Sequence, residues 1–282
     1  MIAIRRGEQT YPARLNDLRR PPDPLWSSGQ AIDWSRPAVA IVGTRRMSAY
    51  GARIAREVAT VLARAGAIVV SGLAQGIDSE AHRATVDAGG CTVAVLGEGL
   101  AAFEASGPLR RRRLAERIRE RGAVVSEYAL DLTADRWTFP RRNWTIAALA
   151  ETVVVVEAGH DSGALITARA AVALRRPVHA VPGPLGASTW VGANRLIADG
   201  RATLLADPGD LLGILGLAGG TSAERPTSLA DRALELLAAG PVDLDQVATE
   251  LGLHAAGVAT LLAEMVILGL VTPTGDGRFA RR

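Results

Sequence analysis

The stretch AVAIVGTRRMSAYGARIAREVATVLARAGAIVVSG, residues 38–72, decides the fold of this chain. It begins with an apolar run that ends in Gly43. Residues 52–66 follow with apolar side chains at helical spacing, and a second apolar run covers residues 67–72. A buried strand, an amphipathic helix and another buried strand form the repeating unit of a parallel sheet. The segment therefore predicts a strand–helix–strand unit.

The same alternation continues along the chain. Further apolar runs cover residues 91–97, 123–127, 152–158 and 177–183. We predict an α/β fold with an extended, Rossmann-like, doubly wound and mostly parallel sheet. Such folds bind ligands at the carboxyl ends of their strands. The segments expected around one crevice are Gly43–Arg46, Ser71–Asp78, Gly97–Gly99, Glu127–Asn143, Gly159–Gly163 and Pro182–Gly186.

Composition limits the class of protein. The chain has 282 residues, and no apolar run reaches the ~20 residues that a membrane-spanning helix needs. With the single cysteine Cys91 no intramolecular disulfide can form, so we expect a cytoplasmic protein without membrane association. All 32 basic residues are arginine, whose planar group binds phosphate bidentately.

Four segments make up the expected domain organisation. Residues 1–36 form an extension packed on the core, 37–216 the Rossmann-like domain, 217–227 a linker and 228–282 a winged-helix domain. The last segment combines three helical patterns with a hairpin around a Gly-Asp-Gly turn. It carries four arginines and seven acidic residues, a net charge of −3, which leaves +6 for residues 1–227. The third helical pattern, 254–269, contains no arginine, so we interpret this domain as a protein-contact element.

The loop after the first strand is built for an anion. Gly43 lacks the further glycines of a dinucleotide site, and a triphosphate loop needs a lysine, which the chain does not have. A helix N-terminus with free N–H groups, together with Arg45 and Arg46, suits phosphate. The alternative is a tight turn with solvated arginines. No cofactor is expected.

The second loop, residues 71–90, carries Asp78, Ser79 and His82. We expect Asp78 or Ser79 to cap the following helix, and His82 to pair locally with Asp78. Two potential ligands without a third are a weak metal signal, so no metal is expected.

Two later segments resemble nucleic-acid contacts. Phe139 ends a loop before Arg141, Arg142 and Asn143 begin a helix, an arrangement in which bases stack on the ring and phosphates meet arginine. The alternative for Phe139 is a hydrophobic staple. Ser162 and Gly163 open another helix, but no nucleophile motif surrounds Ser162. The arginine-rich run 109–122 is either a solvated helix face or a DNA contact.

Together these segments resemble the DNA-processing protein A family (DprA, also called Smf). The motifs that carry the resemblance are IVGTRRMSAYG, SGLAQGIDSEAH, VAVLGEGL, FPRRN, VVVVEAGHDSGALITARAA and VPGPLG. The resemblance implies an extended Rossmann-like core with a winged-helix tail. It also implies a non-enzymatic homodimer that binds and protects single-stranded DNA and helps to load RecA recombinase during natural transformation.

The resemblance also assigns site residues. Arg45 and Arg46 would bind phosphate, Phe139 would stack on a base, and basic or polar side chains would line the pocket. The remaining expected DNA contacts are Gly43, Thr44, Ser71, Gly72, Arg136, Arg141, Arg142, Asn143, Ser162 and Gly163. Trp144 and Gln75 stand where the family commonly has basic residues, so a phosphate contact is altered or lost there.

Two other functions are alternatives. A nucleoside monophosphate phosphoribohydrolase would need the signature P-G-G-x-G-T-x-x-E, but residues 181–190, VPGPLGASTW, lack its second adjacent glycine and its glutamate. A transcription regulator would use the C-terminal domain on duplex DNA, which its net charge of −3 disfavours.

Overall fold

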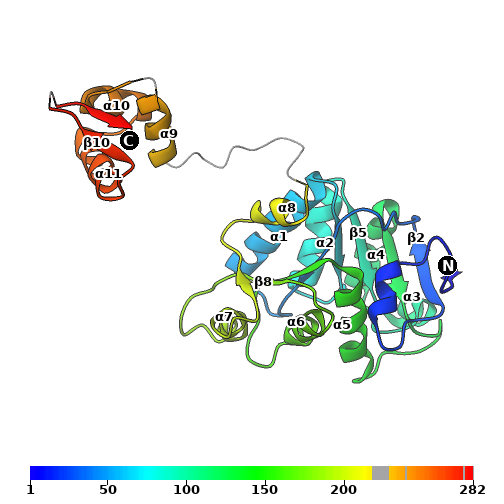
Figure 1. The fold of residues 1–282 in the computed structure, drawn as a ribbon. Helices are drawn as coiled ribbons and strands as arrows, with labels where there is room; N and C mark the ends of the chain where they lie inside the picture. The colour runs from blue at the N-terminus through cyan, green and yellow to red at the C-terminus, as the bar shows by residue number, and fades with distance from the viewer. Residues whose placement is uncertain (218–228, 239, 276, 282) are drawn as a thin grey trace. The chain divides into compact units, whose positions relative to one another are not determined.

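The computed structural model describes residues 1–217, 229–238, 240–275 and 277–281 (Figure 1). The chain divides into two compact units, Met1–Ala218 and Gly219–Arg282. The expected linker, residues 217–227, lies outside the described residues apart from Leu217.

A nine-stranded sheet forms the centre of the first unit, in the order β1-β2-β6-β5-β4-β3-β7-β8-β9. Its strands are β1 (Ile2–Ile4), β2 (Leu25–Gly29), β3 (Ala38–Val42), β4 (Ile68–Ser71), β5 (Cys91–Val95), β6 (Ala123–Ser126), β7 (Thr152–Val155), β8 (Val178–Ala180) and β9 (Thr203–Leu204). From β6 to β9 all neighbouring strands are parallel. The six predicted strands are all present, because an uninterrupted apolar run suits a strand that is covered on both faces.

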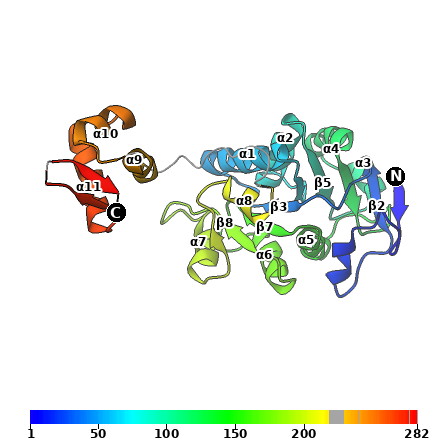
Figure 2. The same ribbon diagram turned by 45° about the horizontal axis from the view of Figure 1, so that its top comes forward.

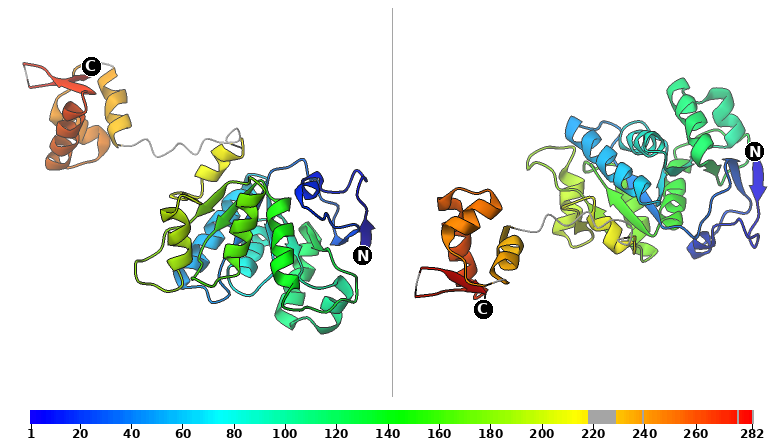
Figure 3. Two further views of the ribbon diagram at one scale, coloured as in Figure 1. Left: turned by 60° about the horizontal axis from the view of Figure 1, so that its bottom comes forward. Right: turned by 90° about the horizontal axis from the view of Figure 1, so that it is seen from above.

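Helices cover both faces of the sheet, as Figure 2 shows, with α1, α2 and α4 on one side and α5, α6 and α7 on the other. Figure 3 shows the same two layers in two further views. The helices of this unit are α1 (Ala49–Arg64), α2 (Ile77–Asp87), α3 (Leu100–Ser106), α4 (Leu109–Arg121), α5 (Thr138–Leu149), α6 (Ala164–Ala173), α7 (Val191–Ala198) and α8 (Asp210–Ile214). The prediction of a doubly wound α/β fold is confirmed.

The N-terminal segment is more than an extended chain lying on the core. β1 and β2 are antiparallel to each other, and β2 pairs with β6 between Trp26 and Ser126, so the segment extends the sheet. A short 3-10 helix, Ala13–Asp17, lies between the two strands. At the other edge, β9 was not anticipated, because its two residues are exposed and carry no apolar pattern.

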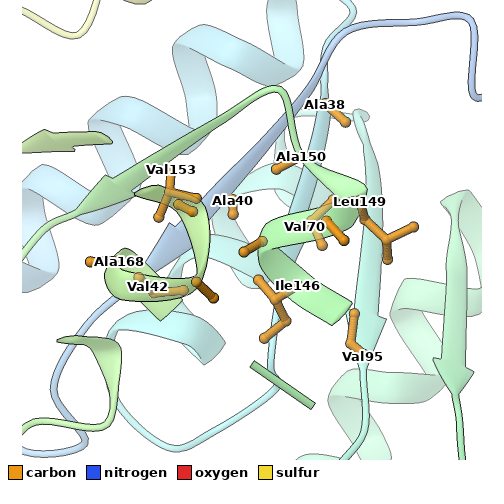
Figure 4. Close-up of a cluster of buried hydrophobic side chains, with 14 of the residues drawn as sticks. Ala38, Ala40, Val42, Val70, Val95, Ile146, Leu149, Ala150, Val153 and Ala168 are labelled. Atoms are coloured by element: carbon orange, nitrogen blue, oxygen red, sulfur yellow. The ribbon is translucent and has the colours of Figure 1, made fainter. Parts of the chain in front are cut away.

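The core on the α5–α6 side fixes the position of the site. Ile146 and Leu149 of α5 point toward the sheet, where they meet small apolar side chains such as Ala40 and Val70 (Figure 4). Small residues on the strands let the helix approach closely, so the first turn of α5 is held at the carboxyl ends of β3 and β4.

The second unit contains three helices followed by a two-stranded ribbon. The elements are α9 (Leu229–Ala238), α10 (Leu244–Leu251), α11 (Ala255–Ile267), β10 (Val271–Pro273) and β11 (Phe279–Arg281). This is the architecture that the three helical patterns and the hairpin predict. Among the described helices none alone is long and apolar enough to cross a bilayer; α10 and α11 qualify only as a pair, bent by 109° at its break.

Candidate nucleic-acid interface

A cavity of about 480 Å³ opens at the carboxyl end of β3, between the loops that precede α1, α5 and α6. We call it the first cavity. It is lined by ten of the thirteen expected site residues: Gly43, Thr44, Arg45, Arg46, Arg136, Phe139, Arg142, Asn143, Ser162 and Gly163. Segments that lie more than 100 positions apart in the sequence therefore meet at one place, as expected from the topology of a parallel sheet.

Phe139 and Arg45 face each other in this cavity. The guanidinium carbon of Arg45 lies 5.6 Å from the centre of the Phe139 ring. The ring is half-buried and packs against Gly97, where an added Cβ atom would come within 2.7 Å of it. The expectation that Phe139 ends a loop is wrong, because α5 already begins at Thr138 and Pro140 is tolerated in its first turn.

Arg142 belongs to the wall of the cavity and is buried. One of its terminal nitrogens donates to the carbonyl oxygen of Gly72 at 2.7 Å and to that of Val95. Its guanidinium carbon lies 5.9 Å from the Phe139 ring centre, and burial lowers its pKa to about 10 while the Asp78 carboxylate raises it. Arg142 therefore stays charged at neutral pH and ties α5 to two strand ends.

Asp78 engages the backbone of Gly43 and Gly72, two of the expected DNA contacts. It does not cap α2, whose N-cap is Gly76 with a φ of 93°. Instead its carboxylate accepts the N–H of Gly72 at 3.1 Å and bonds to the backbone of Ala74 and Gly43. Burial raises the pKa of Asp78, and the nearby Arg142 charge lowers it. The amide of Gly72 is thus satisfied inside the protein.

The loop between β3 and α1 is likewise bonded internally. The N–H of Thr44 donates to the carbonyl oxygen of Glu157 at 2.7 Å, and that of Arg46 to the Thr44 hydroxyl at 3.2 Å. The buried Glu157 side chain accepts bonds from Ser48, which caps α1. Glu157 was not proposed from the sequence, although an acid directly after the apolar run 152–156 was a usable signal. The side chains of Arg45 and Arg46 are exposed.

Three expected residues lie outside the cavity lining. The buried hydroxyl of Ser71 donates to the carbonyl oxygen of Ile41 at 2.6 Å, and Gly72 holds Arg142. Arg141 is exposed and forms an ion pair with Glu127 at 2.7 Å. These residues support the site; their side chains do not line it.

Ser162 and Gly163 open α6 at the opposite wall, as predicted. The Asn143 side-chain amide donates to the Gly163 carbonyl oxygen at 3.1 Å, which joins α5 to α6. An acidic side chain that the sequence had not suggested, Asp161, also lines the cavity and is almost fully exposed.

His82 does not pair with Asp78 as expected. It is fully buried, and its Nδ1 atom lies 2.7 Å from the Thr92 hydroxyl. Burial lowers its pKa to about 3, so the ring is neutral at physiological pH. Within the described residues, no three His, Cys, Asp or Glu side chains come together as metal ligands.

The arginine-rich helix α4 is largely engaged in internal contacts. Arg111 donates to the carbonyl oxygen of Leu73 at 2.9 Å and pairs with Glu98 at 3.2 Å. Three more of its arginines have partners in the same unit: Arg112 with Glu104, Arg117 with Asp87 and Arg119 with Glu104. These contacts favour a structural role for most of the run.

Comparison with known proteins identifies the family. The family model described as DNA recombination-mediator protein A matches residues 3–216. The chain belongs to this family. A DprA winged helix domain matches residues 220–277, which confirms the architecture predicted for the C-terminal unit.

Individual relatives agree with this assignment. The putative DNA processing protein DprA of Mycobacterium tuberculosis is 38% identical over 279 residues, which are 95% of this chain and 70% of that protein. Protein Smf of Escherichia coli is 40% identical over 203 residues, 72% of this chain and 53% of that protein.

Two solved structures share the fold. DprA of Streptococcus pneumoniae has 35% sequence identity and a TM-score of 0.69, covering 75% of this chain and 73% of its own. DprA of Helicobacter pylori, for which a single-stranded DNA binding mode is described, has 26% identity and a TM-score of 0.68. That match covers 76% of this chain and 94% of its own.

Proposed function

We propose that this chain binds single-stranded DNA in the first cavity. The observation that carries the proposal is the contact between Arg45 and Phe139, which places a cation beside a half-buried ring in an open cavity. An unpaired base can stack on the ring while its phosphate meets Arg45 and Arg46. A base inside a duplex could not reach the ring, so we expect a preference for single strands. The single-stranded DNA binding described for the Helicobacter pylori relative supports the same ligand class.

The proposed role of the binding is protection of incoming or processed single strands. We further propose that the chain, acting in the cytoplasm as a homodimer, helps to load RecA recombinase during transformation and recombination. The family membership supports this role. Light scattering tests the dimer. Acceleration of RecA-dependent ATP hydrolysis on single-stranded DNA tests the loading, and unchanged hydrolysis would remove it.

A gel shift across a salt series tests the binding proposal. Single-stranded and duplex oligonucleotides of the same sequence are compared with the full chain. The single strand is expected to bind more tightly, with an affinity that falls as salt increases, because several arginine–phosphate contacts release counterions. Equal or tighter binding of the duplex would overturn the proposal.

The nucleotide-hydrolase alternative has its own test. Incubation of the protein with AMP should leave the nucleotide intact if the cavity only binds nucleic acid. Release of free adenine would favour the enzyme. The buried carboxylate that lines the cavity, Asp78, is engaged by backbone N–H groups, which speaks against its use as a catalytic base.

A further inference from the structure

A second cavity adjoins the first on the other side of the arginine loop. Its volume is about 560 Å³. It shares Thr44, Arg46, Asp161 and Ser162 with the first cavity, so the two cavities lie side by side at the carboxyl ends of the strands. Arg45 and Phe139 line only the first cavity.

We propose that the second cavity is a subsite for the adjacent nucleotide of the same DNA strand, with Arg46 at the phosphate that joins the two nucleotides. The inference rests on the proposed function and extends it. Arg46 is exposed and lines both cavities, which is the position that a linking phosphate requires. Its planar group can donate hydrogen bonds to two phosphate oxygens at once.

The polar groups of the second cavity suit a nucleotide. Ser188 and Thr189 close its far side, and their hydroxyls can donate to phosphate or to base acceptors. Asp161 repels phosphates but can accept hydrogen bonds from the exocyclic amino groups of bases. We therefore infer that the sugar–phosphate chain follows Arg46 while the bases face Asp161.

The far wall of this cavity is held in place. Trp190, directly after Thr189, is buried and packs on Tyr50 with ring centres 5.3 Å apart. The side chain of Asn194 donates to the carbonyl oxygen of Gly183 and accepts its N–H, both at 3.0 Å. The loop that carries Ser188 is therefore anchored at both ends, and binding would not require it to be ordered first.

Filling the second cavity tests the subsite. Ser188→Trp places a large side chain there, and Ser35→Trp is the matched control, an exposed serine that precedes β3 at the opposite edge of the sheet. Affinities of both full-length variants are measured by fluorescence anisotropy for thymidine ligands from a single nucleotide to about ten nucleotides long. Thermal melting shows whether each variant is folded.

For the wild-type chain we expect affinity to rise as the oligonucleotide becomes long enough to enter both cavities. Ser188→Trp should lower the affinity for the longer oligonucleotides about fivefold or more, because one nucleotide contact is lost. The affinity for the shortest ligand should not change. Ser35→Trp should behave as wild type. Unchanged affinities of a folded Ser188→Trp variant, or an equal loss at every length, would overturn the subsite. Absence of any binding by the wild type would instead overturn the proposed function itself.

Discussion

One oxygen of Glu157 accepts both hydrogen bonds that Ser48 donates, from its N–H at 2.9 Å and from its hydroxyl at 3.0 Å. The carboxylate is fully buried and fits there because Gly51, one turn into α1, has no side chain. Since Thr44 also donates to the Glu157 carbonyl oxygen, the loop that carries Arg45 and Arg46 is bonded to Glu157 on both sides of the two arginines.

We predict from this relationship that Glu157→Ala lowers both stability and single-strand affinity. Two partly buried donors of Ser48 would lose their acceptor, at a cost of about 1 kcal/mol or more in the free energy of unfolding. Glu157→Gln retains an acceptor at the same place and should keep most of the affinity. Thermal melting and anisotropy measure the two effects. An Ala variant that binds as well as wild type would show that the loop needs no anchor.

Arg45 and Arg142 line the same cavity but should respond differently to substitution. Arg45→Gln is expected to weaken single-strand binding without a change in melting temperature, because its side chain is exposed. If one phosphate contact is lost, a plot of the logarithm of the binding constant against the logarithm of the salt concentration should become less steep by about 0.7. A folded variant with unchanged affinity and salt slope would remove Arg45 from the site.

Arg142→Gln should instead destabilise the core, because the buried guanidinium donates to the carbonyl oxygens of Gly72 and Val95 and its charge lies near the buried Asp78 carboxylate. Leaving a buried acceptor without its donor costs about 1–3 kcal/mol. Denaturant unfolding measures this loss. Because Arg142 is buried, a charge reversal at this position tests folding and not binding. An unchanged unfolding midpoint would contradict the structural role.

Phe139→Ala is expected to cost about 1–3 kcal/mol of binding free energy if a base stacks on the ring. Phe139→Leu keeps apolar volume against Gly97 but removes the aromatic face, so it separates packing from stacking. Both variants are compared with wild type by anisotropy and thermal melting. A lower melting temperature with normal affinity would favour the hydrophobic staple.

Stability should fall in acid because of His82. Its folded-state pKa of about 3 lies below the ordinary value of 6.5, so protonation favours the unfolded chain. Above about pH 6.5 His82 is neutral in both states and costs no stability. Between about pH 6.5 and pH 3 the free energy of unfolding should fall by about 1.4 kcal/mol per pH unit. Denaturant unfolding of wild type and His82→Gln at several pH values measures it. The same acid sensitivity in both proteins would assign the loss to other groups.

The sequence by itself determined the strand–helix alternation, the parallel sheet and the helices with a hairpin at the C-terminus. Apolar periodicity encodes these features locally, so residues 38–72 already contain the repeating unit. Because ligands bind at the carboxyl ends of parallel strands, the sequence also predicted that Arg45, Phe139 and Ser162 lie close together, without any contact being known.

Tertiary structure alone decided which groups remain available to a ligand. Asp78 and Glu157 occupy most of the peptide N–H groups that the loops were expected to offer, and Arg142 is turned into the core. A pattern of residue types does not show which partner satisfies a donor, because that depends on segments brought together only by folding. The second cavity beside Arg46 has the same origin, since its walls come from three separate loops.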